Sequence, residues 1–158
     1  MKKMQLSKYK TLKLTNVLSM KITIRENECD LNTIIEQMEA YIKTKGALQI
    51  GPLIQYSRTF VNDNDELDME VVIMMQCNNF IHNVKSPYSM NAIIRVSKCI
   101  YCRFMGPENK LKLAYDKINV EAFESDIKLK GDNYTIFLDR NEDEDYITAD
   151  VFMECIEQ

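Results

Sequence analysis

The chain has 158 residues, 46% hydrophobic and 28% charged, which is typical of one globular domain with a sizeable core and excludes a disordered chain. The net charge of −4 disfavours nucleic-acid binding, because phosphate recognition needs a basic stripe. No apolar run approaches the roughly 20 residues that cross a bilayer, so no membrane insertion is expected.

The charges are divided unevenly along the chain. The first 60 residues carry 10 basic and 5 acidic side chains, whereas the rest carry 10 basic and 19 acidic ones. The acidic residues gather in two turns, residues 63–68 and 142–145. Each turn is either an ordinary solvated connection or a docking surface for a basic partner. The lysine-rich start lacks the apolar stretch of a signal peptide, which predicts a cytoplasmic protein.

In the first half, residues 16–25 are predicted to form a strand and residues 30–46 a helix. The helix has an apolar face, Asp30 can cap its free N–H groups, and Gly46 suits its end. The apolar residues recur at helical spacing: Leu31, Ile34, Ile35, Met38 and Ile42. Residues 51–77 then read as two strands joined by the first acidic turn.

The second half is predicted to follow the same order. Residues 91–104 form a strand, and Gly106-Pro107-Glu108 begins a helix, because proline is tolerated at the first helical position. One face of this helix carries Leu111, Ala114, Tyr115 and Ile118. Residues 131–155 give two further strands joined by the second acidic turn.

The two halves form an internal repeat. Aligning Cys77 with Cys155 also pairs Met75 with Met153 and Ile73 with Val151. The sequence therefore predicts a single α+β domain over residues 1–158, built from two βαββ units with pseudo-twofold symmetry. Repeat one covers about residues 10–77, and repeat two covers about residues 91–155.

Cysteine and histidine give little support for metal or catalytic chemistry. Cys99 and Cys102 are the only CxxC pair, and in a regular strand their sulfurs point to opposite faces. His82 is the only histidine, and no nucleophile motif or phosphate-binding loop accompanies it. We expect free or structural thiols, no metal, no cofactor and no enzymatic activity.

The methionines of the first repeat have two interpretations. Methionine fills gaps in cores, and it also lines adaptable binding surfaces. On the second interpretation, the methionines and the acidic turns are candidate protein contacts: Met69, Met74, Met75, Asp63, Asp65, Glu66, Glu142 and Asp143.

Three stretches resemble the gyrase-inhibitor-like (SOUL-type) domains, which also serve as effector-binding domains of multidrug-sensing regulators. They are Gly51 to Tyr56, Arg103 to Glu108 with the helix that follows, and the last two strands. The resemblance implies an antiparallel sheet with two helices on one side and a groove between the halves.

The resemblance also implies a ligand site. In the regulators, this groove binds apolar cations with aromatic rings and a glutamate of the final strand. Asp150 stands where that glutamate is expected, one methylene shorter, and the chain has no tryptophan. The candidate groove residues are Tyr56, Tyr101, Tyr115, Tyr134 and Asp150.

The opening YKTLKLTNVLSMKITIRE and the acidic turns are similar to a branch of small proteins from Gram-positive type VII secretion loci, which includes the cytoplasmic chaperone of a secreted nuclease toxin. This resemblance implies binding to the toxin or its small helical escort, and delivery to the secretion ATPase. The alternatives are a small-molecule sensor for apolar cations and, more weakly, an antitoxin that docks on a large enzyme.

Overall fold

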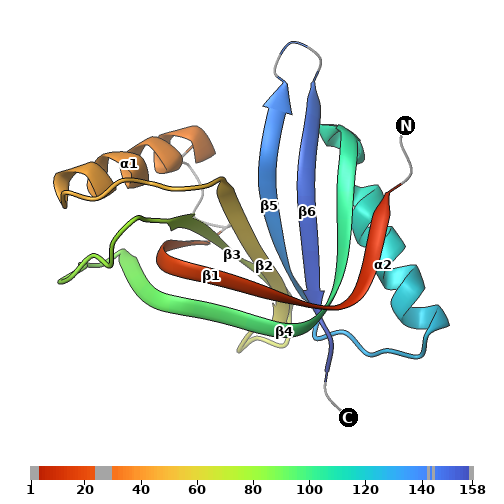
Figure 1. Cartoon of the computed structure of the whole chain (residues 1–158). Helices are drawn as coiled ribbons and strands as arrows, with labels where there is room; N and C mark the ends of the chain where they lie inside the picture. The colour runs from red at the N-terminus through yellow and green to blue at the C-terminus, as the bar shows by residue number, and fades with distance from the viewer. Residues whose placement is uncertain (1–3, 24–29, 142, 144, 157–158) are drawn as a thin grey trace. The chain divides into compact units, whose positions relative to one another are not determined.

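The computed structural model describes residues 4–23, 30–141, 143 and 145–156. The chain divides into two compact units, residues 13–94 and residues 1–12 with 95–158. We call them the α1 unit and the α2 unit after the helix that each contains, and we describe each by itself. Figure 1 shows the elements of both. Neither helix is long and apolar enough to span a membrane.

The α1 unit contains the later part of β1 (Gln5–Thr23), α1 (Leu31–Thr44), β2 (Leu53–Val61), β3 (Leu67–Gln76) and the start of β4 (Tyr88–Pro107). β3 pairs antiparallel with both β1 and β2. The predicted helix is confirmed: Asp30 Oδ1 accepts a hydrogen bond from the Asn32 backbone N–H at 3.4 Å. At the other end, Gly46 has a φ of 73°, and the next N–H, of Ala47, reaches back to Ile42 O at 3.1 Å.

The core of the α1 unit lies between α1 and one face of its strands. Ile34, Met38 and Ile42 of the helix pack with residues of β1 and β3. Side chains alternate between the faces of a strand, so every second residue of β3 points to the helix. The cluster includes the strand residues Leu18, Val71, Ile73 and Met75.

The α2 unit contains the later part of β4, a 3₁₀ turn η2 (Glu108–Lys110), α2 (Lys112–Glu124), β5 (Asp132–Asn141) and β6 (Tyr146–Glu154). β6 pairs antiparallel with both β4 and β5. Ala114, Ile118 and Ala122 of α2 pack on one face of these strands, with a cluster that includes Cys102, Phe104, Ala149 and Val151.

The two predicted first strands and the second helix start need correction. Pro107 ends β4 instead of opening the helix, and η2 intervenes before α2. β1 begins at Gln5 and not near residue 16, because positive φ angles at Tyr9 and Asn16 bend the strand without ending it. β4 is likewise continuous through Lys98, whose φ is 58°.

The α+β fold class is confirmed, and each unit contains strand, helix, strand and strand in that order. Local geometry recurs as well. The Cys77 N–H donates to Asn16 O at 2.8 Å, and the Cys155 N–H donates to Lys98 O at 3.0 Å. Gly51 and Gly131 have φ angles of 80° and 94°, a region that favours glycine. The pseudo-twofold relation between the halves stays a prediction.

Candidate functional site

In each unit one face of the strands is covered by the helix and the opposite face is not; we call the latter the helix-free face. In the α2 unit, Tyr101 and Arg103 of β4 point to the helix-free face, because Cys102 between them packs toward α2. The antiparallel register places Arg103 opposite Asp150 and Tyr101 opposite Phe152. Two aromatic rings and an ion pair therefore share this face.

Asp150 is the centre of a closed polar network on this face. Its Oδ1 accepts hydrogen bonds from Tyr101 Oη and Arg103 Nε, both at 2.8 Å, and its Oδ2 accepts one from Arg103 Nη2 at 3.1 Å. Lys10 Nζ lies 4.6 Å from the centroid of the Tyr101 ring. A buried carboxylate is thus neutralised by a guanidinium, and an ammonium already occupies the ring face.

The environment of Tyr101 holds its hydroxyl in the protonated form. Burial, followed by the neighbouring Asp150 carboxylate, raises the pKa of Tyr101 to about 12. The pKa of Arg103 is raised above its ordinary value, since Asp150 stabilises the charged guanidinium. Tyr101 therefore acts as a hydrogen-bond donor to Asp150 over the whole physiological pH range.

The structure divides the remaining predicted groove residues. Tyr134 lies opposite Phe152 in the register and so shares the face of Asp150. Burial raises the pKa of Tyr134 to about 12, with smaller effects of Asp132 and Glu154. Tyr115 packs with the helix-covered core instead, and its hydroxyl lies 2.6 Å from Thr135 Oγ1. Tyr115 is therefore not on the face of Asp150, because it projects from α2.

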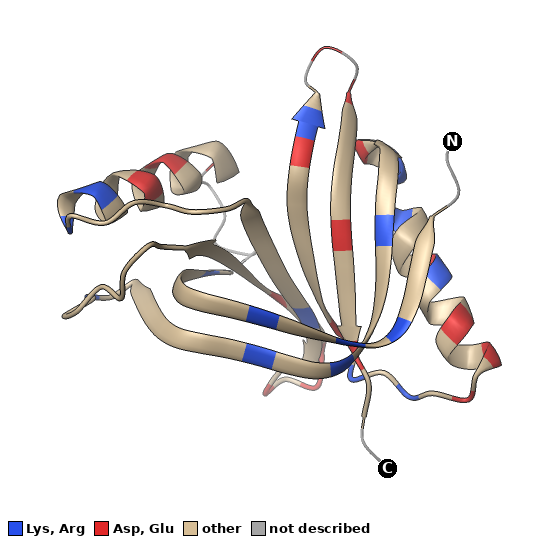
Figure 2. Cartoon of the chain, viewed as in Figure 1, with Lys and Arg blue, Asp and Glu red and all other residues tan. Residues whose placement is uncertain are grey.

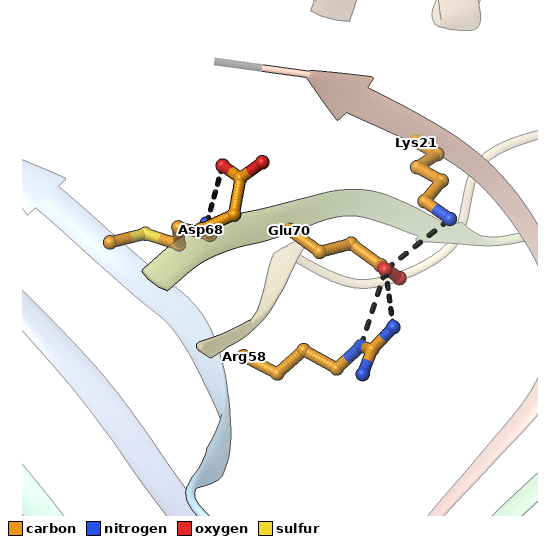
Figure 3. A network of polar contacts seen from close by, with 5 residues as sticks. Lys21, Arg58, Asp68 and Glu70 are labelled. Carbon is orange, nitrogen blue, oxygen red and sulfur yellow. Dashed lines mark hydrogen bonds and ion pairs between the residues drawn. The ribbon is translucent and has the colours of Figure 1, made fainter. Parts of the chain in front are cut away.

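The helix-free face of the α1 unit carries Tyr56, opposite Val72, and a second ion-pair network that the sequence analysis did not identify. Glu70 Oε2 accepts from Arg58 Nη2 at 2.8 Å and Nε at 3.2 Å, and it lies 3.3 Å from Lys21 Nζ (Figure 3). Burial alone would raise the pKa of Glu70, but Arg58 and Lys21 outweigh it and lower that pKa. The Arg58 guanidinium also lies 4.8 Å from the Phe60 ring centroid.

This network borders an open hollow of about 290 Å³. Its walls combine charged groups with the side chains of Ile22, Phe60 and Met69. The pairing of Arg58 with Glu70 could have been predicted from the sequence, because the two residues lie equally far from the acidic turn on the two strands that the turn joins. The contribution of Lys21 could not, because it comes from β1.

The methionine candidates separate by burial. Met74 and Met75 are buried, so they are core residues and not surface contacts, which corrects the expectation for both. Met69 is 46% exposed, and it lies near Val61 and Leu67, which are 62% and 74% exposed. The register pairs Val61 with Leu67 and Met69 with Thr59, so all these side chains share one face. We call Val61, Leu67 and Met69 the hairpin patch.

The hairpin patch continues the face that α1 covers. Val71, Ile73 and Met75 of β3 pack in the core cluster of the helix, and Met69 and Leu67 extend the same alternation beyond it. The exposed acidic residues Asp63, Asp65 and Glu66 lie in the adjoining turn. An apolar strip with an acidic border therefore projects from the α1 unit.

The acidic turn of the α1 unit is ordered by hydrogen bonds within the turn, from both the side chain and the backbone of Asn62. Asn62 Oδ1 accepts hydrogen bonds from the N–H groups of Asn64 and Glu66, at 2.9 and 3.0 Å. The Asn62 N–H donates to Glu66 O at 2.9 Å. In the other turn, Asp143 is exposed and its N–H donates to Asn141 Oδ1, whereas Glu142 lies outside the described residues.

The described cysteines Cys77, Cys99, Cys102 and Cys155 are all free and buried, in agreement with the expectation of free thiols. Burial raises the pKa of each, to about 12 for Cys99, so these thiols are poor nucleophiles. Within residues 4–23 and 30–156, apart from 142 and 144, no cluster of three or more potential metal ligands occurs.

The fold is similar to that of EcmrR, solved by cryo-EM in a complex with DNA, with a TM-score of 0.71 and 14% identity. That match covers 98% of this chain and 58% of EcmrR, so the chain spans little more than half of EcmrR's length. The C-terminal domain of EcmrR alone matches at a TM-score of 0.65 and 14% identity, over 99% of this chain and 98% of the domain.

A protein from Listeria innocua described as a hydrolase matches at a TM-score of 0.62 and 10% identity, over 98% of this chain and 92% of that one. No protein-family model matches the chain. No curated protein matches it in sequence. At these identities the likenesses show the fold alone, and they agree with the gyrase-inhibitor-like fold that the sequence predicts.

Proposed function

We propose that the chain is a non-enzymatic binding domain for a protein segment that is both apolar and basic. The observation that carries this proposal is the hairpin patch, in which three exposed apolar side chains share one face beside an acidic turn. Single exposed apolar residues are common on proteins, but a cluster with a polar rim is typical of an interaction site.

The chemistry of the partner follows from the chemistry of the patch. Val61, Leu67 and Met69 offer apolar area that continues the helix-covered face, so apolar side chains of a partner extend an existing core. Asp63, Asp65 and Glu66 attract lysine or arginine and speed the encounter. Since hydrogen bonds of Asn62 order the turn, little conformational entropy is lost on binding.

The specific form of the proposal is a cytoplasmic chaperone that holds the targeting region of a type VII-secreted toxin and delivers it to the secretion ATPase. Only the resemblance of the sequence suggests this form. The hairpin patch supports a protein partner of the stated chemistry, whichever protein supplies it.

The alternative is a sensor for apolar cations on the helix-free face of the α2 unit. Tyr101, Tyr134 and Phe152 supply rings there, which favours it. However, Arg103 already neutralises Asp150, and Lys10 already lies over Tyr101. A cationic ligand must displace both, so the hairpin patch is the better supported site. The hollow beside Glu70 belongs to the α1 unit. It is a poor small-molecule site as well, because its volume of about 290 Å³ is at the lower limit for such pockets.

The proposal is tested by isolating the tagged chain from its native host in three forms. They are the wild type, Leu67→Glu, and the matched control Ile93→Glu, which changes another exposed apolar residue of the α1 unit. We expect a stoichiometric protein with the wild type and the control, and its loss with Leu67→Glu. Retention of that protein by Leu67→Glu would overturn the hairpin site. Micromolar binding of a lipophilic cation to the wild type, by calorimetry, would favour the sensor instead.

A further inference from the structure

Helix α1 covers only the part of β3 that lies farther from the β2–β3 turn. The chain after α1 is tied to the end of β3, because the Ile50 N–H donates to Gln76 O at 2.8 Å. The Leu48 N–H likewise donates to Asn78 Oδ1 at 2.9 Å. The first turn of α1 therefore lies on the side of the β2–β3 turn, and the core cluster of the helix includes β3 residues only from Val71 onward.

The uncovered part of this face has the length of a short helix. Leu67 precedes Val71 by four residues of β3, which is about 13 Å in a strand. A helix rises about 1.5 Å per residue, so about nine helical residues span the same length. Leu31, in the first turn of α1, borders this space. Helical spacing places Leu31 on the same side of α1 as the buried Met38, yet it is 40% exposed.

The segments that border this space are acidic. Residues 59–84 contain five acidic residues and no lysine or arginine, and residues 30–42 contain three acidic residues and no basic one. Figure 2 shows acidic residues at the β2–β3 turn and along α1. A second copy of the chain that packed through the same face would oppose like charges, and nucleic acid would add negative charge. Charge complementarity therefore favours a basic segment of another protein.

We propose that the partner docks on the hairpin patch as a short, basic amphipathic helix that continues the cover provided by α1. This proposal rests on the proposed function, and it adds the conformation, length and direction of the bound segment. A strand docks by adding backbone hydrogen bonds along the edge of a sheet, whereas an amphipathic helix lays apolar side chains on an apolar surface. The hairpin patch consists of side chains on a sheet face, and α1 covers the same face of the same strands.

The direction of the docked helix follows from its dipole. The N-terminus of a helix carries partial positive charge and the C-terminus partial negative charge. Three exposed carboxylates, of Asp63, Asp65 and Glu66, favour the N-terminus at the β2–β3 turn. The positive N-terminal end of α1 favours the C-terminus at the other end, where the Asp30 cap also attracts a lysine or arginine of the last turn. The docked helix therefore runs in the same direction as α1.

The first test uses two synthetic peptides of about 12 residues with equal numbers of leucines and lysines. Leucines recur at i, i+3, i+4, i+7 and i+8 in one peptide, and leucine and lysine alternate in the other, which suits a strand. We expect the first peptide to bind the full chain about tenfold more tightly and to become helical, by NMR titration and circular dichroism. It should shift the methyl signal of Met69 and not that of the buried Met75.

Leu67→Ser should weaken the binding of the first peptide about tenfold, and the matched control Ile93→Ser should leave it unchanged. An alternating peptide that binds equally or more tightly would overturn the helical occupant. An affinity that Leu67→Ser leaves unchanged would do the same, as would a lack of binding up to about 1 mM. If Leu67→Glu still loses the captured host protein in these cases, the binding site stands and only its helical occupant is wrong.

The second test fixes the direction of docking with a spin label on either end of the first peptide. A label on its N-terminus should broaden the backbone signals of Asp63 and Asp65, and a label on its C-terminus should broaden those of Leu31 and Asn32. The reverse pattern, or equal broadening at both places from either label, would overturn the direction.

Discussion

At the scale of single residues, the partners of Asp150 determine what the helix-free face of the α2 unit can bind. A carboxylate on this face would serve as the counter-charge of a bound cation only if no positively charged side chain of the protein already neutralised it. Two nitrogens of Arg103 donate hydrogen bonds to the Asp150 carboxylate, and Tyr101 Oη donates a third. The residue that the sequence presents as a ligand-binding group is therefore engaged in holding β4 to β6.

Removal of Arg103 should destabilise the fold moderately. Arg103→Ala leaves Asp150 buried with only Tyr101 as a partner, which costs about 1–2 kcal/mol after allowing for the partial exposure of the arginine. Arg140→Ala, which breaks the exposed pair with Glu108, should cost less than about 0.5 kcal/mol. Urea denaturation measures both. Equal losses would show that the Asp150 pair is no more important than a surface pair.

The raised pKa of Tyr101 makes the free energy of unfolding depend on pH in the alkaline range. Its folded pKa of about 12 lies above the value of about 10 for an unfolded tyrosine. Its contribution is therefore complete below pH 10 and is lost as the pH rises toward 12. The difference in unfolding free energy between the wild type and Tyr101→Phe should shrink over this range. A difference that stays constant from pH 9 to pH 12 would contradict the assignment.

At the scale of elements, the burial of residues along β3 is only partly predictable from the sequence. Alternation places Met74 and Met75 on opposite faces, but only the packed structure shows that both faces are buried there. Toward the turn the same alternation leaves Met69 and Leu67 exposed, since the helix-covered cluster includes β3 residues only from Val71 onward. Where a helix stops covering a strand is a tertiary property, which the strand's own sequence does not encode.

Two methionines of this strand should therefore respond differently to truncation. Met75→Ala removes a buried side chain from the α1 core and should cost about 2–4 kcal/mol. Met69→Ala should change stability by less than about 0.5 kcal/mol but weaken partner binding. Thermal unfolding and binding assays on both variants separate these roles. Met69→Ala would contradict the account if it unfolded the chain or left binding intact.

The helices and hairpins were largely predictable because local signals specify them. Asp30, Gly46 and the apolar spacing gave α1 to within about two residues at each end. The extra length of β1 and β4 was not predictable, since the strand continues through residues with positive φ such as Asn16 and Lys98. The partners of Asp150 were missed because the pairing of Arg103 depends on the register between β4 and β6.

At the scale of the whole molecule, the uneven charge distribution favours recognition of a basic partner. The acidic turn of the hairpin adds electrostatic attraction to the apolar contact, and salt screens attraction between exposed charges over about 8 Å at physiological strength. Partner binding should weaken several-fold between low and high salt. Asp63→Asn with Asp65→Asn should weaken it at low salt and flatten the salt dependence. Unchanged affinity of this double variant at low salt would remove the acidic turn from the interface.

The most direct test of the central claim is site-specific photo-cross-linking in the native host, with the photoreactive amino acid placed at Leu67 or, as a control, at Ile93. Both positions are exposed in the α1 unit, but only Leu67 belongs to the hairpin patch. We predict a discrete protein adduct from position 67, mapped by mass spectrometry to a segment rich in lysine or arginine and apolar residues, and none from position 93. The absence of an adduct at position 67, or the same adducts from both positions, would contradict the account.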